Sequence, residues 1–114
     1  MHELSLAQSI INIVEEEFKK ASAKKITEIN LKIGKMAGVS IDSLLFGFEI
    51  SVEDTPLKDA KITINEVPIL CLCKDCNKEF SPRSYIFVCS HCKSNNFEIL
   101  QGRELEIENI IVED

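Results

Sequence analysis

Five cysteines are the residues of this chain with the most evident chemical purpose, and all of them lie between positions 71 and 92. Their order is Cys71-x-Cys73-x2-Cys76-x12-Cys89-x2-Cys92. Two residues between thiolates let the backbone turn tightly enough for both sulfurs to reach one ion, and two such knuckles complete a tetrahedron. The spacing therefore predicts a metal site made by Cys73, Cys76, Cys89 and Cys92.

The remaining cysteine and a histidine stand beside this set. Cys71 would share a strand face with Cys73, so we expect a small buried apolar residue near the site. For His91 we expect a surface position, with ligand exchange on a change of pH or metal as the alternative. Zinc is favoured because four closed thiolates suit structural Zn²⁺, although a rubredoxin-like iron centre stays open on the ligands alone. A closed site has no free coordination position, so catalysis is not expected there.

The first three residues, Met1-His2-Glu3, form a second set of metal-binding groups. The α-amine of Met1, the deprotonated amide of His2 and its imidazole offer three nitrogens in one plane, with the Glu3 carboxylate close by. Ni²⁺ and Cu²⁺ prefer such a tetragonal field of nitrogen and oxygen. The alternative is that residues next to the initiator are frayed and have no function.

Two amphipathic helices are predicted to position these groups. The first runs from Leu4, and Ser5 with Gln8 would cap it if it begins one turn late. The second begins after Ser40 as N-cap and ends at Asp54, Thr55 and Pro56. The expected buried residues are Leu4, Ala7, Ile10, Ile11, Val14 and Phe18 in the first helix, and Ile41, Leu44, Leu45, Phe48 and Val52 in the second.

Three segments alternate between apolar and polar residues, which is typical of half-buried strands. Their inward residues are expected to be Thr27, Ile29, Leu31 and Ile33, then Ala60, Ile62 and Ile64, then Leu105 and Ile107. The fold class is thus α+β, with two helices on a small three-stranded sheet and an inserted zinc-ribbon-like module. We expect residues 1–66 plus 103–114 to form the α/β domain and residues 67–102 to form the zinc-binding module.

Composition restricts the function classes. The net charge is −6, with 13 Lys and Arg against 19 Asp and Glu, whereas a protein that tracks a nucleic-acid backbone needs clustered Lys and Arg. No nucleic-acid partner and no membrane are therefore expected, and the absence of a leader favours the cytoplasm. A zinc-ribbon adaptor for nucleic acid or for a transcription or translation assembly is the alternative, disfavoured because Phe80, Tyr85, Phe87 and Phe97 are expected in a core. A thiol-disulfide oxidoreductase would require a reactive pair at a helix start.

Several segments together resemble the HypA/HybF family of hydrogenase nickel-incorporation proteins. They are the initial MHE, LSLAQSI, INLKIGKMAGV, DSLLFGFE, the knuckles CKDC and CSHC, and the closing GRELEIENI. The resemblance covers essentially the whole chain in order. It implies a nickel metallochaperone, not an enzyme, with Ni(II) as cargo and Zn(II) as structural metal.

The resemblance also implies residue roles and partners. His2 would bind nickel, assisted by the Met1 amine and Glu3, and Asp42 matches an acidic residue tied to nickel in some relatives. The zinc ligands fall on Cys73, Cys76, Cys89 and Cys92. Implied partners are a nickel-handling GTPase at the N-terminal region, the hydrogenase large subunit and, as in some relatives, urease maturation proteins, with the chain a monomer or a homodimer. The chain departs from the family in carrying Asn77 and Lys93 where knuckles usually have proline or glycine; asparagine adopts a left-handed conformation more readily than lysine.

Overall fold

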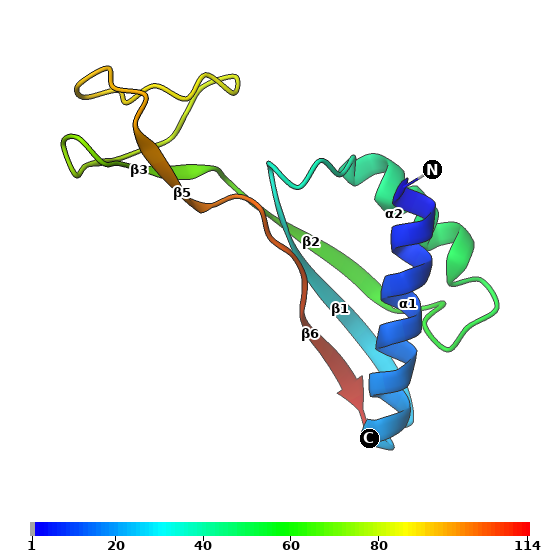
Figure 1. The fold of residues 1–114 in the computed structure, drawn as a ribbon. Helices are drawn as coiled ribbons and strands as arrows, with labels where there is room; N and C mark the ends of the chain where they lie inside the picture. Colours follow the sequence, from blue (N-terminus) through cyan, green and yellow to red (C-terminus); the bar gives the residue numbers. More distant parts are fainter. Residues whose placement is uncertain (1) are drawn as a thin grey trace. The chain divides into compact units, whose positions relative to one another are not determined.

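The computed structural model describes residues 2–114. Its elements are α1 (His2–Ala21), β1 (Lys25–Gly34), α2 (Ile41–Ser51), β2 (Lys61–Val67), β3 (Leu70–Cys73), β4 (Glu79–Phe80), β5 (Phe97–Gln101) and β6 (Leu105–Glu113) (Figure 1). They form two compact units. Unit 1 holds the chain up to Lys32, Gly38–Asn65 and Glu106–Asp114; unit 2 holds Ile33–Ala37 and Glu66–Leu105. The fold class predicted from the sequence is confirmed, since both helices lie on one face of the sheet β2-β1-β6.

Helix α1 begins at His2, so the capping pair suggested at Ser5 and Gln8 is wrong, because Ser5 already lies within the helix. The predicted apolar stripe is largely right. Ala7, Ile10, Ile11 and Val14 are buried, as the three- and four-residue spacing requires. Lys19 and Lys20 occupy the last turn, where cations interact favourably with the helix dipole.

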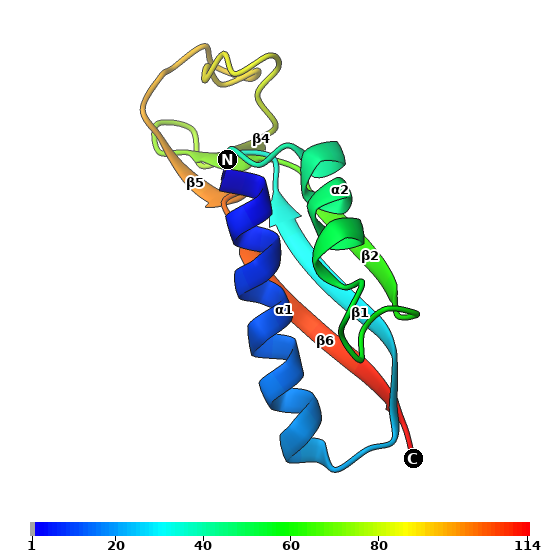
Figure 2. The same ribbon diagram turned by 90° about the vertical axis from the view of Figure 1, so that its right-hand side faces the viewer.

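Helix α2 packs beside α1 (Figure 2). Ser40 is its N-cap, as predicted, and its hydroxyl accepts a hydrogen bond from the Ser43 N–H. The helix ends at Ser51, before the predicted stop, and the Val52 carbonyl then accepts hydrogen bonds from the Thr55 N–H and hydroxyl. Leu44 and Phe48 are buried, but Leu45, predicted to be buried, is 36% exposed because it lines an open pocket together with Phe48 and Ile62.

The sheet β2-β1-β6 differs from the predicted pattern at one residue of β1 and at one residue of β6. In β1 the buried hydrophobic side chains are Ile26, Ile29, Leu31 and Ile33. Thr27 was predicted on the covered face, yet its hydroxyl instead donates to the Ile111 carbonyl, since the alternation slips by one residue. Leu105 was also predicted to point inward, but it opens an edge strand with a neighbour on one side only, and it is 47% exposed.

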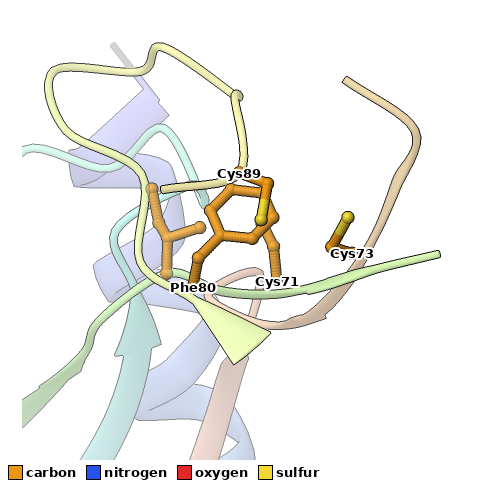
Figure 3. Close-up of a cluster of buried hydrophobic side chains, with 5 residues drawn as sticks. Cys71, Cys73, Phe80 and Cys89 are labelled. Carbon is orange, nitrogen blue, oxygen red and sulfur yellow. The ribbon is translucent and has the colours of Figure 1, made fainter. Parts of the chain in front are cut away.

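Unit 2 contains a second antiparallel sheet, β4-β3-β5, and a small core of its own. Phe80 lies beside Cys71 and Cys89 in this core (Figure 3). Phe87 and Phe97 stack on each other at its border, with ring centroids 5.1 Å apart. Three of the four aromatic residues therefore serve the core as predicted. Tyr85 does not: it is 62% exposed, and its hydroxyl donates to the Lys35 carbonyl.

Two glycines of unit 2, Gly34 and Gly102, allow their backbone segments to pack closely against each other. A Cβ at Gly34 would lie 2.0 Å from the Gly102 carbonyl oxygen, and Gly102 itself has a φ of 121°. The Met36 N–H donates to the same Gly102 carbonyl, and the Gly34 N–H donates to the Glu104 carbonyl. A side chain at Gly34 would push these hydrogen-bonded segments apart, and a Cβ at Gly102 would lie 3.0 Å from the Cα of Ile69.

Among the described residues, no helix is long and apolar enough to cross a bilayer.

Candidate metal centre

Four cysteine sulfurs converge in unit 2. The Sγ atoms of Cys73, Cys76, Cys89 and Cys92 all lie within 4.8 Å of one another. Cys73 and Cys92 are 3.6 Å apart at their sulfurs, and Cys76 and Cys89 are 3.7 Å apart. A disulfide bond would need about 2.05 Å. The edge of a tetrahedron with Zn–S bonds of about 2.3 Å is roughly 3.8 Å, so these separations match a four-thiolate site.

The two knuckles share one backbone geometry. The Cys73 N–H donates to the Lys78 carbonyl, and the Asn77 N–H donates back to the Cys73 carbonyl. In the second knuckle Cys89 makes the corresponding hydrogen bonds with Ser94 and Lys93. Asn77 and Lys93 both adopt a positive φ, 61° and 66°, so lysine takes the left-handed position as asparagine does. The two knuckles, which were predicted to be equivalent from their cysteine spacing, therefore have the same backbone conformation in the structure.

Backbone N–H groups also point at the sulfurs. The His91 N–H donates to the Cys89 Sγ over 3.3 Å. Burial acts to raise the pKa of Cys89, but the N–H groups of Cys92 and His91 and the neighbouring sulfurs outweigh it and lower that pKa to about 6. For Cys92 the Ser94 N–H acts to lower the pKa, yet the Cys73 sulfur and burial prevail and raise it to about 12. Four touching thiols cannot all ionise unaided, so a bound dication would displace protons from them.

A polar link that the sequence analysis missed joins the two knuckles. Asp75, between Cys73 and Cys76, accepts hydrogen bonds from the Ser94 hydroxyl and the Asn96 side-chain amide. These two donors lower the pKa of the Asp75 carboxyl, the Ser94 hydroxyl first. The Ser94 hydroxyl in turn accepts from the Asn96 N–H. An aspartate inside a knuckle was the only signal in the sequence, and it does not reveal its partners.

Cys71 and His91 lie near the four sulfurs in different ways. Cys71 is fully buried on the same face of β3 as Cys73, and burial raises the pKa of its thiol. It does not belong to the four-sulfur group. His91 is exposed, and its Nε2 lies 3.3 Å from the Glu79 carbonyl oxygen. The expected surroundings of both residues, an apolar strand face and a surface, are those in the structure.

The donor set fits a zinc ion. Four sulfur donors at tetrahedral separations are the chemistry of structural Zn²⁺ sites, and N–H groups directed at the sulfurs stabilise thiolates. The apolar core of Phe80 and Cys71 lies beside the sulfurs; Cys73 and Cys89 are buried, whereas Cys92 is exposed. The arrangement can hold a metal and organise unit 2; it leaves no coordination position for a reacting molecule.

The predicted nickel ligands lie in unit 1. Met1 is outside the described residues. His2 is exposed at the first residue of α1. One carboxylate oxygen of Glu3 accepts the Ser40 N–H over 3.1 Å, and this hydrogen bond is the main reason that the pKa of Glu3 is lowered. Asp42 is exposed in the first turn of α2. Within residues 2–114, His2, Glu3 and Asp42 are not gathered as the four cysteines are.

Comparisons with known proteins agree with this architecture. Residues 1–112 match the family model described as hydrogenase/urease nickel incorporation, metallochaperone, HypA. The hydrogenase maturation factor HypA of Chloroflexus aggregans is 43% identical over 108 residues, covering 94% of this chain and 95% of the relative. That of Desulfatibacillum aliphaticivorans is 40% identical over 115 residues, covering 100% and 88%.

Solved structures give the same result. The solution structure of the nickel metallochaperone HypA from Helicobacter pylori superposes with a TM-score of 0.66 at 31% identity, covering 97% of both chains. A second HypA solution structure has a TM-score of 0.71 at 32% identity, covering 98% of this chain and 96% of the other. The fold and the four-cysteine site define a metal-handling protein of two units. The chain belongs to the HypA family of nickel-incorporation metallochaperones.

Proposed function

We propose that the chain carries Ni(II) for the maturation of a nickel-iron hydrogenase and passes the ion on without catalysing a reaction. The observation that carries this proposal is that an exposed His2 opens the first helix of a chain in the HypA family. Nickel would be held by the Met1 amine, the His2 amide and imidazole, and Glu3. Zn(II) would be held by Cys73, Cys76, Cys89 and Cys92 and would supply the cross-link that keeps unit 2 folded.

The position of His2 favours such a nickel site. The first four N–H groups of a helix have no acceptor within that helix, so deprotonation of the His2 amide would break no hydrogen bond of α1. The positive end of the helix dipole also stabilises a deprotonated nitrogen. An exposed site at a chain end can exchange ligands one by one with an acceptor, and the ion leaves while the core stays folded.

Glu3 has two roles in this proposal. One of its carboxylate oxygens already binds the Ser40 N–H at the start of α2. Its other oxygen is the one that would approach nickel. Because Asp42 lies two residues after Ser40, the same contact brings the acidic start of α2 into the neighbourhood of the nickel ligands. We retain Asp42 as a residue that assists nickel binding.

In this proposal the two metals are held by different parts of the chain. Residues 1–66 plus 103–114 would form the nickel-binding α/β domain, and residues 67–102 would form the zinc-binding module. The partners would be a nickel-handling GTPase at the N-terminal region, the hydrogenase large subunit and urease maturation proteins, all in the cytoplasm.

A complementation experiment tests the delivery function. The chain is expressed in cells that lack their own HypA and grow with limiting nickel, and nickel in the purified hydrogenase large subunit is measured. We expect the wild-type chain to restore nickel insertion and the His2→Ala chain to fail at equal expression. Restoration by both chains would remove the proposed role of His2, and restoration by neither would remove delivery to hydrogenase.

A further inference from the structure

A groove in unit 2 borders the second knuckle at Cys89, while its other lining residues have no part in metal binding as proposed above. Its volume is about 350 Å³, and it lies along the segment that leads into the second knuckle. Its lining includes Pro82, Arg83, Ile86, Val88, Ser90 and Lys93. The charged side chains of this lining, Arg83 and Lys93, are both cationic. The chain as a whole has a net charge of −6, so the positive charge of this groove is opposite to that of the protein.

Two apolar residues of the groove, Ile86 and Val88, are not used by the core. Ile86 is 63% exposed and Val88 is 39% exposed, whereas the neighbouring Cys89 is completely buried. An exposed isoleucine and valine beside two cations form a mixed surface, apolar in the middle and positive at its borders. Such surfaces are typical of recognition sites for short segments of other proteins.

The groove is held in shape before any partner arrives. The Ile86 N–H donates to the Arg83 carbonyl over 2.8 Å, and Arg83 and Ile86 face each other across a tight turn. Ser84 and Tyr85 form that turn with φ values of 50° and 62°, a left-handed conformation that side chains other than glycine rarely adopt. The Tyr85 hydroxyl fixes the turn by donating to the Lys35 carbonyl. A preformed groove loses little entropy when it binds.

We propose that this groove binds an extended segment of a partner protein in which a carboxylate stands next to an aliphatic side chain. Arg83 presents a planar set of donors that can bind a carboxylate with two hydrogen bonds, and Lys93 offers a second positive charge. Ile86 and Val88 cover the aliphatic side chain.

Other occupants fit the groove less well. Single-stranded nucleic acid would require aromatic platforms, and the lining contains none. A second copy of the chain would bring a further net charge of −6, so like-charge repulsion opposes it more than it opposes a short segment with one or two carboxylates. The sign of the lining therefore selects an acidic partner.

The experiment is a selection of random extended peptides displayed on phage against the zinc-loaded full chain. The wild type should enrich peptides with Asp or Glu beside Leu, Ile, Val or Phe. Arg83→Glu should weaken the binding of a selected synthetic peptide about tenfold or more, because it removes a charge-assisted pair. Ile86→Ala should weaken it as well, with the zinc content of the chain unchanged.

Arg103→Glu is the matched control, since Arg103 is the other arginine of the chain, is exposed and is outside the groove lining. It makes the same change of charge and should leave peptide binding unaltered. The proposal is overturned if no peptide is enriched, if the enriched peptides are basic, or if both charge reversals have equal effects. Stronger binding of a single-stranded oligonucleotide, or self-association lost only in Arg83→Glu, would assign the groove to nucleic acid or to a second copy instead.

Discussion

At the scale of single residues, the four-sulfur site depends on two short turns that repeat the same hydrogen bonds. Each turn ends in a non-glycine residue with a positive φ, Asn77 or Lys93. The corresponding strain, of order 1 kcal/mol for each residue, is accepted because both N–H groups of the turn then find acceptors. Ligand and non-ligand cysteines should therefore respond very differently to substitution.

Cys92→Ala and Cys71→Ala test that difference. Removing Cys92 leaves three thiolates, so we expect zinc to fall from about one ion per chain to a small fraction of that. Removing Cys71 deletes one buried sulfur from an apolar strand face and should leave the zinc content intact, at a cost of about 1 kcal/mol in the free energy of unfolding. Metal analysis of both purified variants measures the outcome; equal zinc loss would make Cys71 part of the site.

A second prediction at this scale concerns Glu3 and pH. Its folded-state pKa lies below the ordinary value of 4.5, chiefly because of the Ser40 N–H. The hydrogen bond therefore contributes its full stabilisation above pH 4.5, and the contribution is lost as the pH falls through the lowered value. The difference in free energy of unfolding between wild type and Glu3→Gln should be present at pH 7 and shrink below pH 4.5. A difference that stays constant with pH would contradict this role of the Glu3 charge.

At the scale of elements, unit 2 depends on the close approach of Gly34 and Gly102. Gly34→Ala places a Cβ 2.0 Å from a backbone oxygen, which no side-chain rotation relieves. We expect a loss of about 2 kcal/mol or more in the free energy of unfolding. Gly38→Ala is the control, because nothing lies within 4 Å of its Cβ and only its φ of +73° is strained. Chemical denaturation of both variants compares them, and equal losses would show that crowding at Gly34 is not decisive.

The two helices could be predicted from the spacing of their apolar residues, because α1 and α2 each bury one apolar face. The helix stripes were right at Ala7 and Phe48 because helix periodicity extends over several turns. The β1 register was wrong at Thr27, where one residue of slip reverses the face. Exposure of Leu105 could not be foreseen, since no local pattern reveals which strand becomes an edge.

For the candidate site as well, some contacts could be predicted from the sequence and others could not. Cys73 and its three partners were brought together as the spacing required, because a metal knuckle is encoded within four consecutive residues. The contacts of Asp75 with Ser94 and of Glu3 with Ser40 were missed, because both join residues distant in sequence and neither has a local motif. The nickel ligands His2, Glu3 and Asp42 remain predictions.

At the scale of the whole molecule, both helices belong to unit 1 and all five cysteines belong to unit 2. Removal of zinc by a strong chelator should therefore unfold unit 2 and leave the helical circular dichroism nearly unchanged. Amide exchange followed by NMR should show lost protection along β3 and β5 and retained protection in α1. A helical signal that disappears together with zinc would show that unit 1 depends on the zinc site.

The central claim is that nickel and zinc occupy different units, with nickel at the N-terminus. The most direct measurement is a calorimetric nickel titration of the zinc-loaded, untagged chain, beside His2→Ala and His91→Ala, the two histidines of the sequence. The account predicts that His2→Ala abolishes stoichiometric nickel binding, whereas His91→Ala binds nickel as the wild type does. Unchanged binding by His2→Ala, or a loss confined to His91→Ala, would contradict it.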